Sequence, residues 1–169
     1  MRTDSMKLCL PNAAATEALG AALAASRPPR AVVYLHGDLG AGKSTLARAL
    51  LRALGVRGAI RSPTYTLIEP YRLDDGDEAL HLDMYRIAAP GELEFLGLDA
   101  LAEQASLWLV EWPERGGKAL PQADLRVDLA VAGDGRIAGL EGVTAAGVAW
   151  LERVQSDPNL EHFPAVNSR

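Results

Sequence analysis

The sequence feature that most constrains the fold is Gly37-Asp38-Leu39-Gly40-Ala41-Gly42-Lys43-Ser44, an instance of the pattern G-x-x-x-x-G-K-[ST]. Its glycines let the backbone turn tightly and point successive N–H groups inward at an anion. Residues 31–35, just before it, form a continuous apolar run, the pattern of a strand buried on both faces. Residues 45–54 follow with leucines at helical spacing, and Gly55 is placed as a helix stop. Strand, loop and helix in this order predict a phosphate-binding loop that holds ATP or GTP.

The loop also predicts which residues contact the nucleotide. Lys43 reaches the β- and γ-phosphates as a point charge, and the Ser44 hydroxyl can coordinate Mg²⁺. The helix that begins near Lys43 adds the positive end of its dipole. The predicted nucleotide-binding residues are Asp38, Leu39, Gly40, Ala41, Gly42, Lys43, Ser44 and Thr45.

Two carboxylates follow apolar strand-like runs further along the chain. Asp83 ends the run at residues 79–82, and Glu111 ends the run at residues 107–110. Catalysis on a phosphate-binding loop needs a second metal ligand and a group that orients the attacking water, and such carboxylates are a usual source. We therefore expect catalytic roles for Lys43, Asp83 and Glu111. The alternative is that each carboxylate is only a solvated strand end, and spacing does not decide which of them touches the metal.

Ser62-Pro63-Thr64 is a third candidate segment, in the loop after the predicted helix. A threonine there can bind Mg²⁺ or sense the γ-phosphate, as in nucleotide switch loops. Thr64 is also a common strand residue, and residues 64–69 look strand-like. From the residues alone, Ser44, Thr64 and one of the two carboxylates are thus candidate metal ligands.

The other segments predict a single domain. They indicate a strand at 6–10, a helix at 13–26 capped by Asn12, short helices within 91–105, and a hairpin that turns at Gly133-Asp134-Gly135. Thr144 is placed to cap a final helix through Val154, and the tail from Asp157 has little to pack. We expect a P-loop ATPase domain over residues 1–142, then a C-terminal helix and flexible tail over 143–169.

Charge and composition limit the possible partners and location. The chain has 17 Lys and Arg against 22 Asp and Glu, a formal net charge of -5. Independent binding of nucleic acid normally needs a basic excess, so any RNA is expected to be held by a partner protein. The single cysteine, Cys9, cannot form an internal disulfide. The sequence shows neither a signal-peptide pattern nor a membrane-length apolar run, so we expect a cytoplasmic protein.

Taken together, these segments resemble the TsaE (YjeE) ATPases of bacterial tRNA threonylcarbamoyladenosine biosynthesis. Besides the glycine loop, the shared stretches are Ser62-Pro63-Thr64-Tyr65-Thr66-Leu67, His81-Leu82-Asp83-Met84-Tyr85-Arg86, Glu94-Phe95-Leu96-Gly97-Leu98-Asp99 and Val110-Glu111-Trp112-Pro113-Glu114-Arg115. The resemblance covers roughly residues 13–140. Ser44 stands where a threonine is more usual, and both offer the same hydroxyl.

The resemblance implies an α/β P-loop NTPase fold, with a parallel core sheet flanked by antiparallel strands and helices. It also implies Mg²⁺-dependent ATP hydrolysis, slow without partners, that supports another enzyme. The implied partners are the threonylcarbamoyl-transferase subunit and its bacterial dimerisation partner, which modify adenosine 37 of ANN-decoding tRNAs. Contact with tRNA is then indirect, through that complex.

Residue by residue, the resemblance makes Thr64 the switch threonine and Asp83 a Mg²⁺-linked carboxylate, so the metal ligands that it implies are Ser44, Thr64 and Asp83. It makes Glu111 the residue that positions the water, and places Trp112 close to the nucleotide. We interpret His81 as a structural residue of the sheet rather than a proton-transfer group. Arg61, Arg72 and Arg86 are interpreted as solvated, although one of them could face the phosphates or a partner.

Two other functions fit the loop alone. A small-molecule kinase needs an acceptor pocket and usually an Arg-rich lid, but residues 71–77 are acidic. A non-catalytic nucleotide switch is the second alternative. The guanine-reading string N-K-x-D is absent from the sequence, which favours ATP over GTP.

Overall fold

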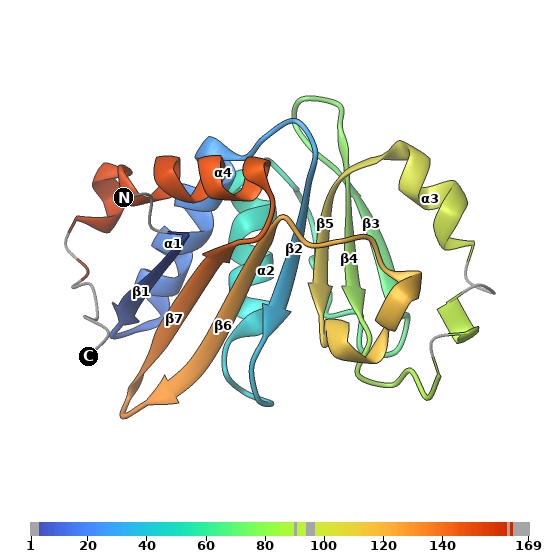
Figure 1. The fold of residues 1–169 in the computed structure, drawn as a ribbon, viewed down its shortest axis with the longest axis horizontal. Helices are drawn as coiled ribbons and strands as arrows, with labels where there is room; N and C mark the ends of the chain where they lie inside the picture. Colours follow the sequence, from blue (N-terminus) through green and yellow to red (C-terminus); the bar gives the residue numbers. More distant parts are fainter. Residues whose placement is uncertain (1–3, 90, 94–96, 162, 164–169) are drawn as a thin grey trace.

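One mixed sheet with strand order β1-β7-β6-β2-β5-β4-β3 runs through the molecule (Figure 1). The computed structural model describes residues 4–89, 91–93, 97–161 and 163. The strands are β1 (Ser5–Leu10), β2 (Ala31–His36), β3 (Ile68–Arg72), β4 (Glu78–Asp83), β5 (Ala105–Glu111), β6 (Leu125–Ala132) and β7 (Gly135–Gly142). The α-helices are α1 (Ala13–Ser26), α2 (Lys43–Ala53), α3 (Leu98–Gln104) and α4 (Ala145–Gln155).

The centre of the sheet is parallel and its flanks are antiparallel. β2 pairs in parallel with β5 and β6, and β5 pairs in parallel with β4. β7 and β1 extend the sheet antiparallel at one side, and β3 does so at the other. The predicted fold class is therefore confirmed. The arrowheads of β6, β2, β5 and β4 all point toward the lower edge in Figure 1, so the side chains that end these strands lie along one edge of the sheet.

Two apolar clusters cover the two faces of the sheet. α1 and α2 pack side by side on one face, where Leu19, Leu46 and Val33 are at most 1% exposed. α3 lies with the cluster of the other face, which contains Leu80, Leu98 and Trp108. Alternate residues of the parallel strands thus enter opposite clusters, which explains why their sequences are continuously apolar.

The predicted helix starts are confirmed by side-chain caps. The Asn12 side chain accepts a hydrogen bond from the N–H of Ala15 (2.9 Å), and Thr144 accepts one from Gly147 (3.1 Å). Helices leave their first N–H groups without intrahelical partners, and these side chains satisfy one each. Whether the chain divides at residue 142 stays a prediction.

Two predictions are wrong in detail. The segment after Pro63 was expected to be strand-like from Thr64, but β3 begins only at Ile68. The N–H of Leu67 donates to the carbonyl of Pro63 (2.8 Å), which closes a turn in place of a ladder, and Leu67 has φ +67°. The tail from Asp157 was expected to have little to pack. A 3₁₀ turn at Pro158–Leu160 instead brings Leu160, which is 5% exposed, into the main apolar cluster, the one that contains Leu19, Leu46 and Val33.

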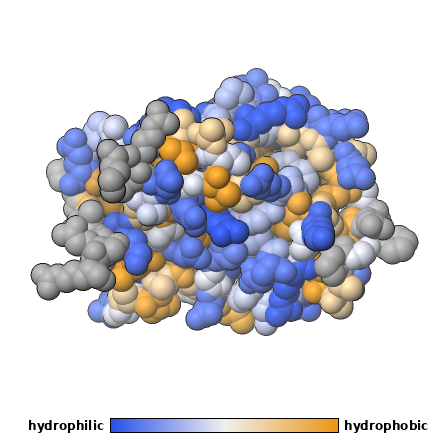
Figure 2. Space-filling model, viewed as in Figure 1, coloured by the Kyte–Doolittle hydropathy of each residue, from blue (hydrophilic) through white to orange (hydrophobic). Residues whose placement is uncertain are grey.

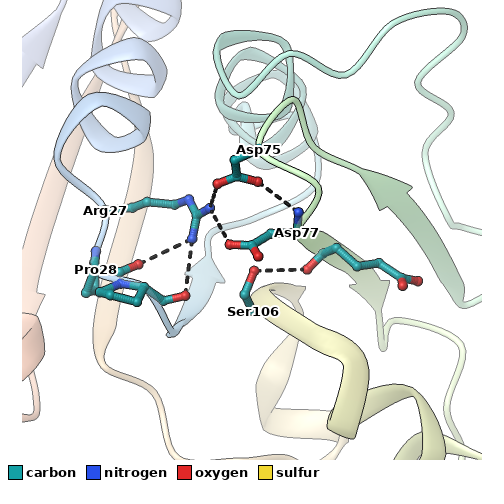
Figure 3. Close-up of polar contacts among 7 residues, drawn as sticks. Arg27, Pro28, Asp75, Asp77 and Ser106 are labelled. Carbon is teal, nitrogen blue, oxygen red and sulfur yellow. Dashed lines mark hydrogen bonds and ion pairs between the residues drawn. The ribbon is translucent and has the colours of Figure 1, made fainter.

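The edge of the sheet opposite the arrowheads is held by one arginine (Figure 3). Arg27, just after α1, extends its guanidinium to Asp75 (2.8 Å) and Asp77 (3.1 Å) in the β3–β4 turn. It also donates to the carbonyls of Pro28 and Pro29. The Arg27 side chain is only 8% exposed, so this contact ties the start of β2 to the start of β4.

Hydrophilic residues cover much of the face seen in Figure 2, with smaller hydrophobic areas between them. Among the described residues, none of the helices has the length and hydropathy needed to cross a membrane.

Candidate active site

The glycine loop between β2 and α2 has a backbone that its glycines require. Gly37 has φ +146°, and a Cβ at this position would lie 2.5 Å from the carbonyl oxygen of Leu129 on β6. Gly42 has φ +107° and is the N-cap of α2. A side chain at Gly37 would displace the loop from the sheet, and one at Gly42 would strain the entry to the helix.

Lys43 folds back over this loop. Its Nζ donates hydrogen bonds to the carbonyls of Gly37 (2.5 Å) and Asp38 (2.9 Å), and lies 4.5 Å from the ring centroid of Trp112. Burial lowers the pKa of Lys43, and the nearby carboxylates of Glu111 and Asp83 counter part of that shift. The ammonium group is therefore held at the loop with two neutral acceptors that an anion could replace.

Glu111 connects the loop to the sheet. Its Oε1 accepts a hydrogen bond from Ser44 Oγ (3.0 Å), and its Oε2 lies 2.6 Å from His81 Nε2. The Glu111 side chain is 3% exposed and that of His81 2%. A buried carboxylate is costly unless it is hydrogen-bonded, and here each oxygen has one partner.

Asp83 ends β4 directly beside Glu111, because the two residues are paired in the parallel register of β4 and β5. Its Oδ1 accepts a hydrogen bond from the N–H of Tyr85 (2.9 Å). Burial raises the pKa of Asp83, and the charge of Glu111 raises it further, against a lowering by the Tyr85 hydrogen bond. Two buried carboxylates that end neighbouring strands repel each other and attract a cation.

A cavity of about 460 Å³ brings the predicted residues together. It is lined by Leu39, Gly40, Gly42, Lys43, Ser44, Thr45, Ser62, Thr64, Asp83, Tyr85, Arg86, Glu111, Trp112 and Arg136. Of the predicted site residues, only Asp38 and Ala41 are outside this lining. Both belong to the loop backbone, where the N–H of Ala41 donates to the carbonyl of Asp38 (3.0 Å).

Arg136 is a lining residue that the sequence did not predict. It lies at the start of β7 and donates from Nε to the carbonyl of Ala41 (3.0 Å) and from Nη2 to that of Gly40 (3.1 Å). Nothing in the local sequence around Arg136 indicates this contact, since it depends on the β6–β7 hairpin lying beside the loop. Tyr85 also lines the cavity and was not predicted as a site residue, although it belongs to the segment His81-Leu82-Asp83-Met84-Tyr85-Arg86 that carries the family resemblance.

A smaller cavity of about 140 Å³ adjoins the first. The two cavities share Gly42, Thr45 and Arg136. The other residues that line the smaller cavity are Leu10, Asn12, Ala13, Thr16, Asp134 and Gly135. A ligand held at the loop can therefore extend from a strongly charged space into a mostly neutral one.

The oxygen atoms at the loop suit a hard divalent cation. Ser44 offers a hydroxyl, and Glu111 and Asp83 offer carboxylates, the ligand types that Mg²⁺ prefers. Within the part of the chain that is described, His, Cys, Asp and Glu do not form a group of three that could hold a metal alone. A cation at Ser44 would thus need phosphate or water oxygens as well, which is usual for Mg²⁺ in phosphate sites.

Comparison with known proteins shows which family and which solved fold the chain is similar to. A family model described as "Threonylcarbamoyl adenosine biosynthesis protein TsaE" matches residues 10–138. The tRNA threonylcarbamoyladenosine biosynthesis protein TsaE of Haemophilus influenzae is 47% identical over 105 residues, 62% of this chain and 66% of that protein, just under two thirds of its length. The protein of the same name from Bacillus subtilis is 39% identical over 120 residues, 70% of this chain and 73% of that protein. The crystal structure of Bacillus subtilis YdiB superposes with a TM-score of 0.74 at 29% identity, over 89% of this chain and 94% of that one.

Proposed function

The chain belongs to the TsaE family of tRNA threonylcarbamoyladenosine biosynthesis proteins, and from this premise we propose that it hydrolyses ATP in support of the complex that makes this modification. The single observation that carries the proposal is the shared cavity of Lys43, Ser44, Asp83 and Glu111. A phosphate-binding lysine, a metal-binding hydroxyl and two buried carboxylates are the parts that a P-loop nucleotide hydrolase needs.

Two adjoining cavities support the proposed binding of ATP. The phosphates bind in the larger cavity, against the loop N–H groups and Lys43, where the start of α2 adds its dipole. The adenine and ribose extend into the smaller, mostly neutral cavity beside Asn12 and Arg136. Lys43 exchanges its two carbonyl partners for phosphate oxygens, which repays part of the cost of its burial.

Ser44, Thr64 and Asp83 are the residues proposed to hold Mg²⁺. When bound, Mg²⁺ neutralises charge on the phosphates and fixes their orientation. Thr64 lines the same cavity, and its hydroxyl is hydrogen-bonded to that of Ser62 (2.9 Å). Binding of a metal ion by Thr64 would replace this one hydrogen bond.

Glu111 is proposed to position the attacking water. The water oxygen forms a bond to the γ-phosphorus as the bond to the bridging oxygen of ADP breaks, and the water proton passes to the released phosphate or to solvent. Glu111 orients this water through its carboxylate, while Lys43 stabilises charge on the transferred group and on ADP. Trp112 covers the site, where its ring lies against Lys43.

The proposed partners are the threonylcarbamoyl-transferase subunit and its bacterial dimerisation partner, with tRNA contacted only through them. Two large side chains near the mouth of the site are strongly exposed: Leu39 (68%) and Tyr65 (82%). Arg86, which lines the cavity, lies over the Tyr65 ring (4.6 Å to the centroid). A partner bound there would touch residues next to the loop and to Thr64, which supports hydrolysis that depends on the partner. The proposal places the protein in the cytoplasm, with its tRNA.

The test is phosphate release from ATP by the purified chain, alone and with the transferase assembly. We expect slow release by the chain alone and faster release with the assembly, and loss of ATP binding in Lys43→Ala. Phosphate recovered on an organic acceptor would instead indicate a kinase. A chain that neither binds the assembly nor releases phosphate in its presence would contradict the proposal.

A further inference from the structure

His81 lies in the middle of β4, where a sheet residue normally has only a packing role. Its neighbours on the same face of the sheet, Ala79 on β4 and Leu107 and Leu109 on β5, belong to the main apolar cluster. His81 is paired with Leu109, and Glu111 lies two residues further along β5. The imidazole therefore reaches diagonally along the sheet to the carboxylate, a distance that long side chains on neighbouring strands can span.

Glu111 is the hydrogen-bond partner of the His81 ring. Its Nε2 lies 2.6 Å from Glu111 Oε2, whereas its buried Nδ1 has no hydrogen-bond partner among the described residues. A carboxylate accepts hydrogen bonds, so Nε2 is the nitrogen that donates in this contact. An unsatisfied buried nitrogen is a cost that an apolar residue here would avoid.

Glu111 is held from both sides by this arrangement. Ser44, on α2, binds Oε1, and His81, on β4, binds Oε2. A ligand that binds Ser44 would compete for Oε1, whereas Oε2 is bonded to His81, which does not line the cavity. His81 is thus the contact that persists when the front of Glu111 changes partners.

We propose that His81 is a positioning residue that fixes the Glu111 carboxylate through Nε2–H, so that Oε1 faces Ser44 and the nucleotide cavity. The inference rests on the proposed hydrolytic role of Glu111. It also revises the sequence interpretation of His81 as purely structural, because its polar contact is to a site residue. Such supporting hydrogen bonds limit the rotation of an active-site side chain and keep it in its productive geometry.

The first test uses the nucleotide-free protein and needs no activity. Long-range ¹H–¹⁵N spectra of the histidine side chains report which ring nitrogen carries the proton, and His81→Gln identifies the signal of His81. We expect a protonated Nε2. A ring whose Nε2 carries no proton overturns the proposal.

The second test compares three variants in single-turnover ATP hydrolysis. His81→Leu removes the donor, while His81→Gln keeps an amide N–H at about the position of Nε2. Ser106→Ala, at the start of β5 on the opposite edge of the sheet, controls for a general loss of stability. Where His81→Leu does not fold, His81→Met replaces it as the apolar variant.

We expect the apolar variant to lower the hydrolysis rate by roughly 10–100-fold, the effect typical of a lost supporting hydrogen bond. ATP affinity should stay within about threefold of the wild-type value, because the lost hydrogen bond orients Glu111 for the reaction and does not contact ATP. His81→Gln should recover most of the rate. A folded apolar variant with the wild-type rate, or a folded His81→Gln as slow as the apolar variant, overturns the role of His81. Absence of hydrolysis in the wild-type protein with its partners instead contradicts the proposed function.

Discussion

At the scale of single residues, the candidate site consists of charged side chains that are buried. Lys43, Asp83 and Glu111 are 5%, 6% and 2% exposed, so all three depend on one another and on hydrogen bonds rather than on water. The shifted pKa values of Lys43 and Asp83 both reflect desolvation first. Groups perturbed in this way cluster at functional sites, and the strain they store lowers stability in exchange for function.

Glu111→Gln separates binding from hydrolysis. Gln keeps the size of the side chain and an oxygen for Ser44, but it removes the charge that is proposed to orient the water. We expect ATP affinity to change little and the rate of phosphate release to fall by about 10²-fold or more. Calorimetry of ATP binding and single-turnover release measure the two quantities. Glu114→Gln is the matched control, because Glu114 follows closely in sequence but is 51% exposed. An unchanged rate in Glu111→Gln would assign water positioning to another residue.

Asp83, which ends β4, and Asp77, which precedes β4, predict opposite pH dependences of stability. Burial raises the pKa of Asp83 above its unfolded value of 3.8, so its contribution to stability is present below that pH and is lost as pH rises through the native pKa. The Arg27 hydrogen bond lowers the pKa of Asp77, so its contribution is present above pH 3.8 and is lost as pH falls through the native pKa.

Urea unfolding from about pH 3 to about pH 7 tests these signs. Relative to the wild type, Asp83→Asn should gain free energy of unfolding as the pH rises, and Asp77→Asn should lose it. At neutral pH, Asp83→Asn should be more stable than the wild type in the absence of nucleotide. Parallel pH curves for the two variants would be inconsistent with this account.

At the scale of elements, the helices contribute unequally to the site. α2 starts at the phosphate loop and supplies Lys43 and Ser44, whereas α4 crosses the sheet at the opposite edge (Figure 1). α4 nevertheless supplies Trp150, which is fully buried and donates its indole N–H to the carbonyl of Leu23 on α1 (3.2 Å). α4 is thus expected to support the fold without touching the nucleotide.

Trp150→Ala tests this role. Losing a buried tryptophan should lower the free energy of unfolding by roughly 3–5 kcal/mol. Trp150→Phe loses the hydrogen bond and part of the ring, and the hydrogen bond alone is worth about 1 kcal/mol. Urea unfolding gives both values, and ATP affinity should stay unchanged in the folded variants. Wild-type stability in Trp150→Ala would favour the predicted division of the chain at residue 142.

At the scale of the whole molecule, one edge of the sheet carries the cavity and the other carries a structural ion pair. The edge with the strand carboxyl ends holds the cavity, and the other edge is held by Arg27 against Asp75 and Asp77 (Figure 3). Arg27 connects the β2 half of the sheet, which holds the phosphate loop, to the β4 half, which holds Asp83. Alignment of these halves brings Asp83 and Glu111 into the cavity that Ser44 also lines.

Arg27→Met keeps most of the aliphatic length and removes the hydrogen bonds. We expect a loss of about 1–2 kcal/mol in the free energy of unfolding, because the Asp75 and Asp77 side chains are largely exposed and can be solvated. ATP affinity should fall by less than about threefold if the sheet alone aligns the site. A larger fall in affinity at unchanged stability would mean that Arg27 also fixes the relative position of the two halves.

Local pattern was enough to predict many of the residues that line the candidate site. Lys43 and Ser44 follow from the loop motif, and Asp83 and Glu111 follow from their places after apolar runs, because the carboxyl ends of parallel strands share one edge of a sheet. The same local reasoning failed at Thr64, where a turn replaced the expected strand, and at Leu160, whose burial depends on a surface formed by distant segments.

By itself, the sequence determined the phosphate loop, the fold class, and the candidate residues that end strands, since each depends on short-range geometry that residue types and spacing encode. Only the tertiary structure decided that Arg136 reaches the loop from a distant hairpin, and that Ser44, Glu111 and His81 form one hydrogen-bonded chain across α2, β5 and β4. These contacts depend on which strands are neighbours and in what register. Strand order and register follow from how whole faces of the sheet pack, which no local pattern encodes.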